Sequence, residues 1–597
     1  MRERLDRLRD CMRAHRMDAV IVPSADPHLS EYLPARWQAL AWLSGFTGSA
    51  GTLLVAHEQA ALFVDSRYWT QADQELAGSG IEAQKVASIT PAGVADWLAR
   101  HVPRGGCVAV DGAVLALHSA GSLAVLCSSA GLRLEHAADL VGQIWDDRPP
   151  PPAQPVYEHC APHATRSRAD KLGDVREAMA GAKVDRHLVS TLDDIAWLLN
   201  LRGSDVAYNP VFLAHLLVAP DRAWLFLDDD RVPSAVAERL QADGVQLLAY
   251  EGAAAALAEL CAESAVLIDP ARMTLRLKDA LPPSCRVVEA INPSTLLKSR
   301  KSEAELVHVR EAMIEDGVAM CAFYAWFEEA LARGRRLSEL DVDTQLSAER
   351  ARRSNFVGLS FPTIAGFNAH GAMPHYRATP ERFARIEGNG LLLIDSGAQY
   401  LGGTTDITRV WKIGTPSDAM KRDFTRVLQA TMALSRTRFP RGTLAPMLDA
   451  IARAPLWAEG LDFGHGTGHG VGYFLNVHEG PQSISRALPT PHMAMEAGMI
   501  TSIEPGIYRP GRWGVRIENL VANYTVGDDP EEGAFGSFLA FETLSLCPID
   551  TRCVDTSLMR DDERQWLNDY HRKVQASLGP RLEGAARVWL ETRTQPV

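Results

Sequence analysis

Apolar runs broken by short polar turns dominate the first half of the chain. The segments LLVAHEQAALFVD (residues 53–65) and LLVAPDRAWLFLD (residues 216–228) each place a polar turn between two apolar stretches, and they agree at eight of thirteen positions. Each follows a similar helical stretch, AWLSGFTG from Ala41 and AWLLNLRG from Ala196. This pattern predicts β-hairpins set among helices, and therefore an α/β arrangement that occurs twice.

Two composition breaks divide the 597 residues, a length too great for a single hydrophobic core. The proline run Pro149 to Pro152 lacks amide donors and disfavours both helix and central strand. A polar loop at residues 292–305 precedes a long helix that is expected to start near Ser302 and to continue past Trp326. The breaks predict a first α/β domain at residues 1–152 and its duplicate at residues 153–300.

The second half contains two aspartates in unusually apolar surroundings. The segment LLLIDSGAQYLGGTTDITRVW (residues 391–411) predicts a hairpin that turns across Leu401, Gly402 and Gly403. Asp395 is expected in its first strand and Asp406 in its second. A carboxylate in so apolar a strand costs several kcal/mol unless it is paired, hydrogen-bonded or bound to a metal.

A later segment repeats this pattern with glutamates. In GMITSIEPGIYRPGRWGVRIENLV (residues 498–521), Glu504 follows Ile503 as Asp395 follows Ile394, and Glu518 is expected in the returning strand. Two such hairpins suggest an internal pseudo-twofold. Four converging carboxylates cannot all ionise unpaired, so either some are protonated or cations lie between them.

Histidines in a glycine-rich segment complete the candidate site. In FGHGTGHGVG (residues 463–472) the glycines allow close backbone approach around His465 and His469. A set of four carboxylates and an imidazole suits Mn²⁺, Co²⁺ or Zn²⁺ better than a thiophilic ion.

Composition narrows the expected partners. A formal net charge of -13, without a clustered basic segment, argues against nucleic acid. Nine cysteines scattered without a CxxC pair indicate free thiols in a reducing compartment. The N-terminal segment lacks the apolar stretch of a signal peptide, and no run of about 18 apolar residues occurs. We therefore expect a cytoplasmic protein without nucleic-acid or membrane partners.

Several motifs together give the chain a family resemblance. The chain resembles the cytosolic-type Xaa-Pro aminopeptidases of the M24 pita-bread metallopeptidase family in five motifs. These are FPTIAGFNAHGAMPHY, IDSGAQYLGGTTDITR, HGTGHGVGYFLNVHEGP, SIEPGIY and VRIENL. The resemblance extends to DPHLSEY and SGFTGSAGT near the N-terminus and to DDERQWLNDYH near the C-terminus. It implies two creatinase-like α/β domains, an α+β pita-bread catalytic domain with pseudo-twofold symmetry at residues 301–535, and a C-terminal extension at residues 536–597 packed on it.

The resemblance also implies roles for individual residues. Asp406 and Glu518 are expected to bridge two divalent ions, most simply Mn²⁺, with Asp395 completing one site and His469 with Glu504 the other. Glu504 is the expected proton shuttle. His375, His465 and His478 are expected around the scissile bond, with His375, His469, His478 and Arg67 binding substrate. His370 is interpreted as a surface or loop residue, because only His375 precedes the Tyr376 that the family pattern requires.

The expected reaction is release of the N-terminal residue from peptides with proline in second position, by attack of a hydroxide that bridges the two ions. Relatives are often homodimers, which we expect here too. Two alternatives stay open: a prolidase, which cuts only Xaa-Pro dipeptides and shares all five ligands, and a metal-free binding module of the same fold. The native metal, the preferred first residue and the physiological peptides are not encoded in these motifs.

Overall fold

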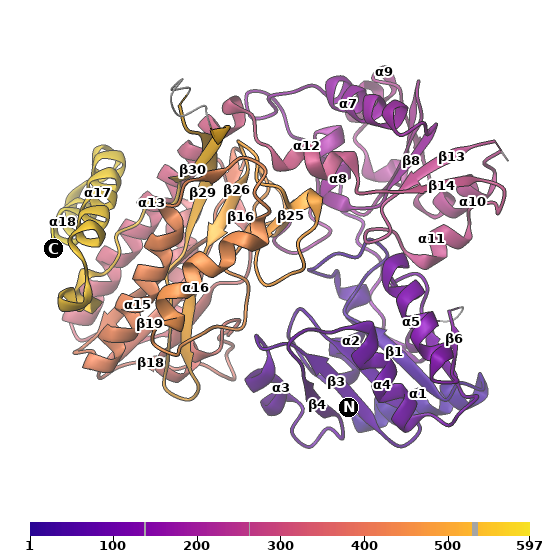
Figure 1. Ribbon diagram of the computed structural model, residues 1–597, viewed down its shortest axis with the longest axis horizontal. Coiled ribbons are helices and arrows are strands. Elements are labelled where there is room, and N and C mark those ends of the chain that lie inside the picture. The colour runs from indigo at the N-terminus through magenta and orange to yellow at the C-terminus, as the bar shows by residue number, and fades with distance from the viewer. Residues whose placement is uncertain (137–138, 262, 528–534) are drawn as a thin grey trace. The chain divides into compact units, whose positions relative to one another are not determined.

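The computed structural model describes residues 1–136, 139–261, 263–527 and 535–597, and the chain forms two compact units, Met1–Thr295 and Leu296–Val597 (Figure 1). The finer division at residues 152, 300 and 535 stays a prediction. Pro149 to Pro152 lie in a stretch without helix or strand, as their missing donors predict. The expected loop at residues 292–305 instead contains helix α12 (Pro293–Ser299), whose first position suits proline because the amide there needs no partner.

The first unit contains two six-stranded sheets of the same topology. Their strand orders are β4-β3-β2-β1-β5-β6 and β12-β11-β10-β8-β13-β14. The strands of the first sheet are β1 (Ala19–Pro23), β2 (Thr52–Ala56), β3 (Ala60–Val64), β4 (Glu82–Lys85), β5 (Cys107–Val110) and β6 (Arg133–Glu135). Those of the second are β8 (Arg186–Val189), β10 (His215–Val218), β11 (Ala223–Phe226), β12 (Val245–Leu248), β13 (Ala265–Ile268) and β14 (Arg286–Glu289). The predicted hairpins β2-β3 and β10-β11 are both antiparallel, which confirms the duplication.

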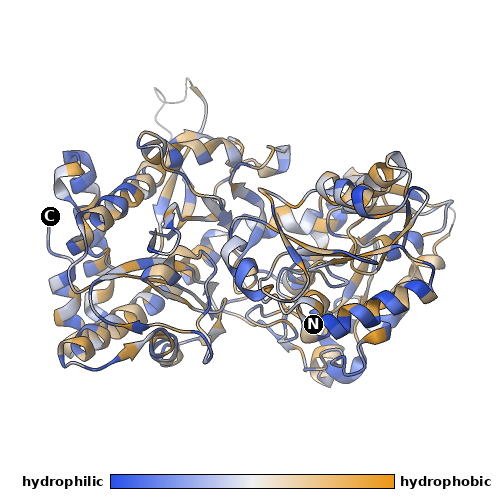
Figure 2. Cartoon of the chain, turned by 90° about the horizontal axis from the view of Figure 1, so that it is seen from below, coloured by the Kyte–Doolittle hydropathy of each residue, from blue (hydrophilic) through white to orange (hydrophobic). Residues whose placement is uncertain are grey.

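Helices cover both sheets. They are α1 (Arg2–Ala14), α2 (Ala39–Ser44), α3 (Trp69–Glu75), α4 (Pro91–His101), α5 (Leu117–Ser129) and α6 (Leu140–Ile144) around the first sheet, and α7 (Arg168–Gly181), α8 (Leu192–Leu199), α9 (Ser234–Ala242), α10 (Ala253–Ala258) and α11 (Leu275–Asp279) around the second. Apolar residues gather on the strands and on the helix faces turned toward them (Figure 2). Among the described helices, none is both long and apolar enough to cross a bilayer. All nine cysteines are free thiols, as predicted.

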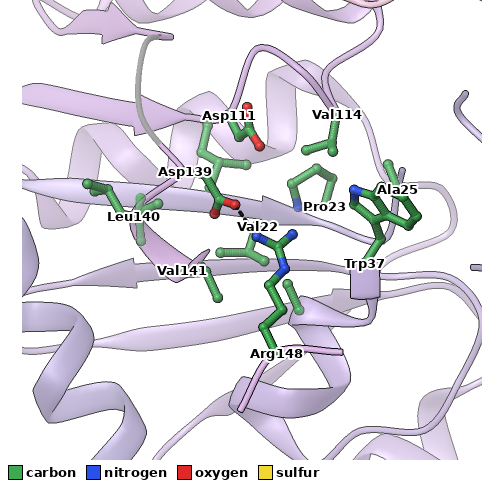
Figure 3. Close-up of a pocket in the computed structure, with 13 residues that line it drawn as sticks. Val22, Pro23, Ala25, Trp37, Asp111, Val114, Asp139, Leu140, Val141 and Arg148 are labelled. Atoms are coloured by element: carbon green, nitrogen blue, oxygen red, sulfur yellow. Dashed lines mark hydrogen bonds and ion pairs between the residues drawn. The ribbon is translucent and has the colours of Figure 1, made fainter. Parts of the chain in front are cut away.

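A pocket opens at the carboxyl ends of the parallel neighbours β1 and β5 (Figure 3). Trp37 and Asp111 line it, and an ion pair of 2.5 Å between Asp139 and Arg148 lies beside them. In open α/β sheets this edge is a common place for a crevice, because the chain leaves adjacent strands in opposite directions. All the lining residues belong to the first unit, and none of them is a predicted site residue.

The second unit contains one six-stranded sheet, several smaller sheets and long helices. The sheets follow the orders β17-β19-β22, β16-β20-β21, β15-β18, β27-β28 and β23-β30-β29-β26-β24-β25. The strands are β15 (Leu337–Ser338), β16 (Phe356–Leu359), β17 (Ile364–Phe367), β18 (Arg385–Ile386), β19 (Gly390–Ser396), β20 (Ala398–Tyr400), β21 (Gly403–Thr404), β22 (Ile407–Ile413), β23 (Phe439–Pro440), β24 (Gly468–Gly470), β25 (Glu479–Ile484), β26 (Ile500–Ile503), β27 (Gly506–Arg509), β28 (Trp513–Arg516), β29 (Asn519–Thr525) and β30 (Phe538–Thr543). The helices are α13 (Glu303–Ala332), α14 (Glu339–Ala351), α15 (Asp418–Ser435), α16 (Asp449–Trp457), α17 (Asp561–Leu578) and α18 (Gly584–Arg593).

Helix α13 begins where the sequence predicts. The side chain of Ser302 accepts a hydrogen bond from the backbone N–H of Glu305, whose carboxylate in turn accepts from the N–H of Ser302. This capping box satisfies two of the amides that a helix start leaves unpaired. The helix then continues past Trp326, as expected, and packs with β19, β22 and α15 in one large apolar core.

The C-terminal segment is bound tightly to this core. Strand β30 pairs with β29, so the predicted extension contributes a strand to the large sheet. Trp589 of α18 stacks on Trp411 of β22, with ring centroids 5.5 Å apart. The hydroxyl of Tyr570 on α17 accepts a hydrogen bond of 2.6 Å from the fully buried guanidinium of Arg409.

Candidate metal centre

The first predicted hairpin consists of two strand pairs in series. Strand β19 pairs with β22, and the chain between them forms a second, shorter pair, β20 with β21, around Leu401 and Gly402. Asp395 is the penultimate residue of β19 and lies opposite Thr408. Asp406 lies directly before β22, outside the strand.

The second hairpin has the same design. Strand β26 pairs with β29, and β27 with β28 forms the inner pair. Glu504 directly follows β26, and Glu518 directly precedes β29. The prediction that Asp406 and Glu518 lie within strands is therefore wrong by one residue. At both positions the returning chain leaves the inner pair to join the outer one, and this interruption of the ladder leaves no mark on the apolar pattern. The repeated arrangement confirms the predicted pseudo-twofold.

His469 is the central residue of β24, and its glycine neighbours admit other chains closely. A Cβ atom at Gly468 would lie 1.8 Å from the carbonyl oxygen of Ser502, and one at Gly470 would lie 2.1 Å from that of Glu479. Glycine is therefore required at both positions. The Nδ1 atom of His469 lies 2.9 Å from the carbonyl oxygen of Gly470. That contact places a proton on Nδ1, so a metal ion would bind through Nε2. Burial lowers the pKa of His469, but the hydrogen bond to Asp406 and the charges of Glu504 and Asp406 outweigh it and raise that pKa to about 9, so a bound cation would displace the proton from Nε2.

The structure brings the predicted ligands together. Nε2 of His469 lies 3.5 Å from Oδ2 of Asp406 and 3.5 Å from Oε1 of Glu504. Single ligand atoms of Asp406, His469 and Glu518 all lie within 4.8 Å of one another. Asp395 lies at the edge of this cluster, where its charge acts on both Glu504 and Glu518.

The electrostatics of the cluster fit bound cations. Burial raises the pKa of Asp395 to about 6 and that of Glu504 to about 7, and the charge of Asp406 adds to both shifts. Burial, followed by the charge of Asp406, also raises the pKa of Glu518 well above its usual range. The buried Oδ1 atom of Asp395 has no hydrogen-bond donor among the described residues. Mutually repelling carboxylates, one with an oxygen lacking a donor, together with an imidazole, form a donor set suited to hard or borderline divalent ions.

Arg516 holds this cluster in place, although the sequence analysis did not single it out. Its guanidinium donates 2.6 Å hydrogen bonds to Oδ2 of Asp395 and to the hydroxyl of Tyr508. It also donates to Thr408, whose hydroxyl donates in turn to Oε2 of Glu518 at 2.7 Å. Arg516 and Thr408 each stand two residues from a predicted ligand, and this strand spacing is the signal that could have identified them.

The predicted histidines lie around this network. Nε2 of His465 is 2.7 Å from the hydroxyl of Tyr508. The ring centroid of His478 lies 4.3 Å from that of His469, nearly at right angles. His375 follows Pro374, whose carbonyl oxygen accepts a hydrogen bond from Arg516 at 3.2 Å.

His370 lies in the short turn Asn368–Ala372 and is partly exposed, but it has a structural partner that the sequence did not predict. Its Nδ1 lies 2.9 Å from both carboxylate oxygens of Glu339, a fully buried side chain, and its ring stacks on Tyr376. The hydroxyl of Tyr376 donates to Glu339 at 2.9 Å. The His-Tyr motif therefore joins a histidine near Arg516 to a tyrosine that anchors this loop.

Arg67 lies in the first unit, just beyond β3. Asp65 accepts two hydrogen bonds from its guanidinium, at 2.9 and 2.7 Å. About a quarter of the side chain is exposed, at 27%. The bidentate contact orients the guanidinium, and its role toward a peptide stays a prediction.

Family models match the chain in four consecutive parts. Residues 4–141 and 147–305 each match a model described as the creatinase/prolidase N-terminal domain. Residues 307–523 match metallopeptidase family M24, and residues 537–597 match the C-terminal region of that family.

Two curated relatives and one solved structure match nearly the whole of this chain. A probable Xaa-Pro aminopeptidase P from Laccaria bicolor is 38% identical over all of this chain and 93% of its own length. Aminopeptidase P2 from Arabidopsis thaliana is 38% identical over 97% and 86% of the two chains. A solved X-prolyl aminopeptidase from Caenorhabditis elegans, described as a cytosolic enzyme with a di-nuclear active site, superposes with a TM-score of 0.94 at 32% identity, over 100% of this chain and 99% of its own. A dipeptidase from Mycobacterium ulcerans covers only 63% of this chain, with a TM-score of 0.50.

Proposed function

The chain belongs to the Xaa-Pro aminopeptidases of metallopeptidase family M24, and from this membership we propose that it releases the N-terminal residue from peptides whose second residue is proline. The observation that carries the proposal is the full-length match, including both N-terminal parts, to aminopeptidases of this specificity. The dipeptidase match, which leaves more than a third of the chain uncovered, favours the aminopeptidase over a prolidase.

Five side chains would hold two divalent cations. We propose that Asp406 and Glu518 contact both ions, that Asp395 completes one site, and that His469 with Glu504 completes the other. Mn²⁺ is the ion we expect, with Co²⁺ or Zn²⁺ as substitutes. Bound divalent cations lower the pKa of water and stabilise negative charge on a peptide oxygen.

The protein's own groups would then position and transfer protons. Glu504 is suited to accept and return a proton, because its carboxylate faces the centre of the cluster and hydrogen-bonds only weakly to Ser502, at 3.3 Å. A bond to proline is a tertiary amide without an N–H, so its cleavage needs a proton donor for the departing secondary amine. We propose that this proton donor is among the histidines of the site, His375, His465 and His478. Replacing His375 with Ala should lower turnover of an Xaa-Pro peptide while metal content is retained.

Substrate recognition would involve the first unit as well. We propose Arg67 as a clamp on the peptide, because Asp65 holds its guanidinium rigidly while part of it stays accessible. Arg67→Ala should raise KM more than it lowers kcat, measured with two ions bound per chain. We further propose that the protein is cytoplasmic, because the similar C. elegans aminopeptidase is described as cytosolic. That it forms a homodimer stays a prediction from the family resemblance.

Matched peptides test the function directly. Release of the first residue from an Xaa-Pro-Xaa peptide should be abolished by EDTA and restored by Mn²⁺, while the Xaa-Ala-Xaa counterpart stays nearly uncut. Cleavage of Xaa-Pro dipeptides alone would establish a prolidase instead. A purified protein that binds no ion after incubation with Mn²⁺ would revive the binding module.

A further inference from the structure

A carboxylate lies between two lysines next to the candidate site. Glu479, at the start of β25, is buried, with Oε1 at 2.5 Å from the ammonium of Lys301 and Oε2 at 3.1 Å from that of Lys298. Both lysine side chains are also almost fully buried, at 1% and 2% exposure. Taking three charges out of water costs several kcal/mol each, which their mutual attraction repays only in good geometry. An arrangement this costly suggests a role beyond stability.

The triad is tied to His478 through the chain. Glu479 directly follows His478 and lies opposite Gly470, the residue after His469. With Glu479 fixed, the start of β25 has little freedom, and His478 is held with its ring against that of His469. Both lysines lie shortly after the point where the chain enters the second unit, Lys298 on helix α12 and Lys301 just beyond it. The backbone N–H of Lys301 donates to the carbonyl oxygen of Gly498 at 3.0 Å, so Lys301 has an anchor outside β25.

We propose that Lys298, Glu479 and Lys301 form a positioning triad that holds His478 at the orientation needed to bind the proline-containing substrate. The triad touches neither substrate nor metal and acts through His478. This inference rests on the proposed function for its kinetic readout, but its geometric claim concerns the protein alone.

Charge-balanced variants separate positioning from stability. Glu479→Gln leaves two lysines without their shared carboxylate, so it should destabilise the fold and is a poor test on its own. The triple variant Lys298→Met, Glu479→Met, Lys301→Met removes all three charges at similar volume and should fold. We expect it to bind two Mn²⁺ ions per chain, to melt near the wild-type temperature, and to lose about 10- to 100-fold in kcat/KM on an Xaa-Pro peptide.

A double-mutant cycle with His478 provides the decisive comparison. If the triad acts through His478, the triple variant should cost less than about twofold in a His478→Ala background, where nothing is left to position. If the triple variant lowered kcat/KM equally in the wild-type and His478→Ala backgrounds, or did not lower it in the wild-type background, the proposal would be overturned. Glu328, which lies between Arg552 and Arg593 and also bonds Trp411, supplies a matched control. Glu328→Gln should change kcat/KM by the same factor in the wild-type and His478→Ala backgrounds.

A spectroscopic readout keeps the test independent of the activity. The metal-free protein is labelled with 13C-histidine, and the NMR resonance of His478 is assigned by its loss in His478→Ala. This resonance should shift and broaden in the triple variant and should be unchanged in Glu328→Gln. If the His478 resonance did not change in the triple variant, the positioning role would be wrong even if activity fell. If the wild-type protein cuts no Xaa-Pro peptide but its His478 resonance still shifts in the triple variant, the proposed function is refuted and the positioning role of the triad is supported.

Discussion

The two hairpins that carry the candidate ligands have one backbone design and different chemistry. In the first, Asp395 is compensated by a 2.6 Å ion pair with Arg516. In the second, Glu504 has no arginine ion pair among the described residues and faces His469 at 3.5 Å. A near-symmetric scaffold thus presents one carboxylate held by an arginine and one that faces an imidazole instead.

The hairpins also stabilise each other's ligands. Arg516, on the second, holds Asp395 of the first, and Thr408, on the first, holds Glu518 of the second. Arg409, next to Thr408, donates to the carbonyl oxygen of Glu518 at 2.7 Å. Neither half can form its part of the site alone, so the pseudo-twofold is a functional unit.

The largest effect is expected from Asp406→Ala, because this residue is proposed to contact both ions. Metal content should fall together with activity, by at least about a thousandfold in kcat/KM. Elemental analysis alongside peptide cleavage measures both. A variant that kept two ions and full turnover would show that Asp406 is not a metal ligand.

Glu504→Gln should come next, with kcat reduced about 100- to 1,000-fold. The change removes the proton acceptor of the second hairpin but keeps its shape. Asp395→Asn is the matched change in the first hairpin, where we expect weaker metal binding that added Mn²⁺ partly rescues. If excess Mn²⁺ rescued both equally, the proposed chemical difference between the hairpins would be wrong.

Arg516→Met should cost about 10- to 100-fold in activity or metal affinity, because Asp395 loses its counter-charge. The variant tests the cross-contact from the second hairpin to the first. Arg509 lies on the same hairpin as Arg516 and makes a partly exposed ion pair with Asp423 of helix α15. Arg509→Met is therefore the control and should leave metal affinity unchanged. Titration of the metal-free proteins with Mn²⁺ compares the two.

The smallest effect belongs to Thr408→Val, which removes the reciprocal contact. A single buried hydrogen bond to a charged group contributes about 1.5 to 3 kcal/mol, and a bound ion would offset much of its loss at Glu518. We expect at most about a tenfold fall in Mn²⁺ affinity, read from the same titrations. A loss larger than that of Arg516→Met would reverse the order of the two cross-contacts.

The sequence predicted two kinds of feature: segments that occur twice, and charged residues within apolar strands. The duplicated α/β topology follows from the matching segments around Leu53 and Leu216, and the ligand set from carboxylates placed against apolar strands. It did not reveal helix α12, because a polar segment that begins with proline reads equally well as a loop. The two-residue spacing from Glu518 and Asp406 marks Arg516 and Thr408 as candidates, but the ligand that each one contacts across the hairpins depends on tertiary register, which the spacing does not encode.

The contact between Tyr570 and Arg409 joins helix α17 to the support of the candidate site. Arg409 donates to the carbonyl oxygen of Glu518, and the Tyr570 hydroxyl accepts a hydrogen bond from the same buried guanidinium. Helix α17, which carries Tyr570, follows both hairpins in the sequence, so a ribosome delivers it after both hairpins have been synthesised. During translation the two hairpins therefore exist for a time without this contact.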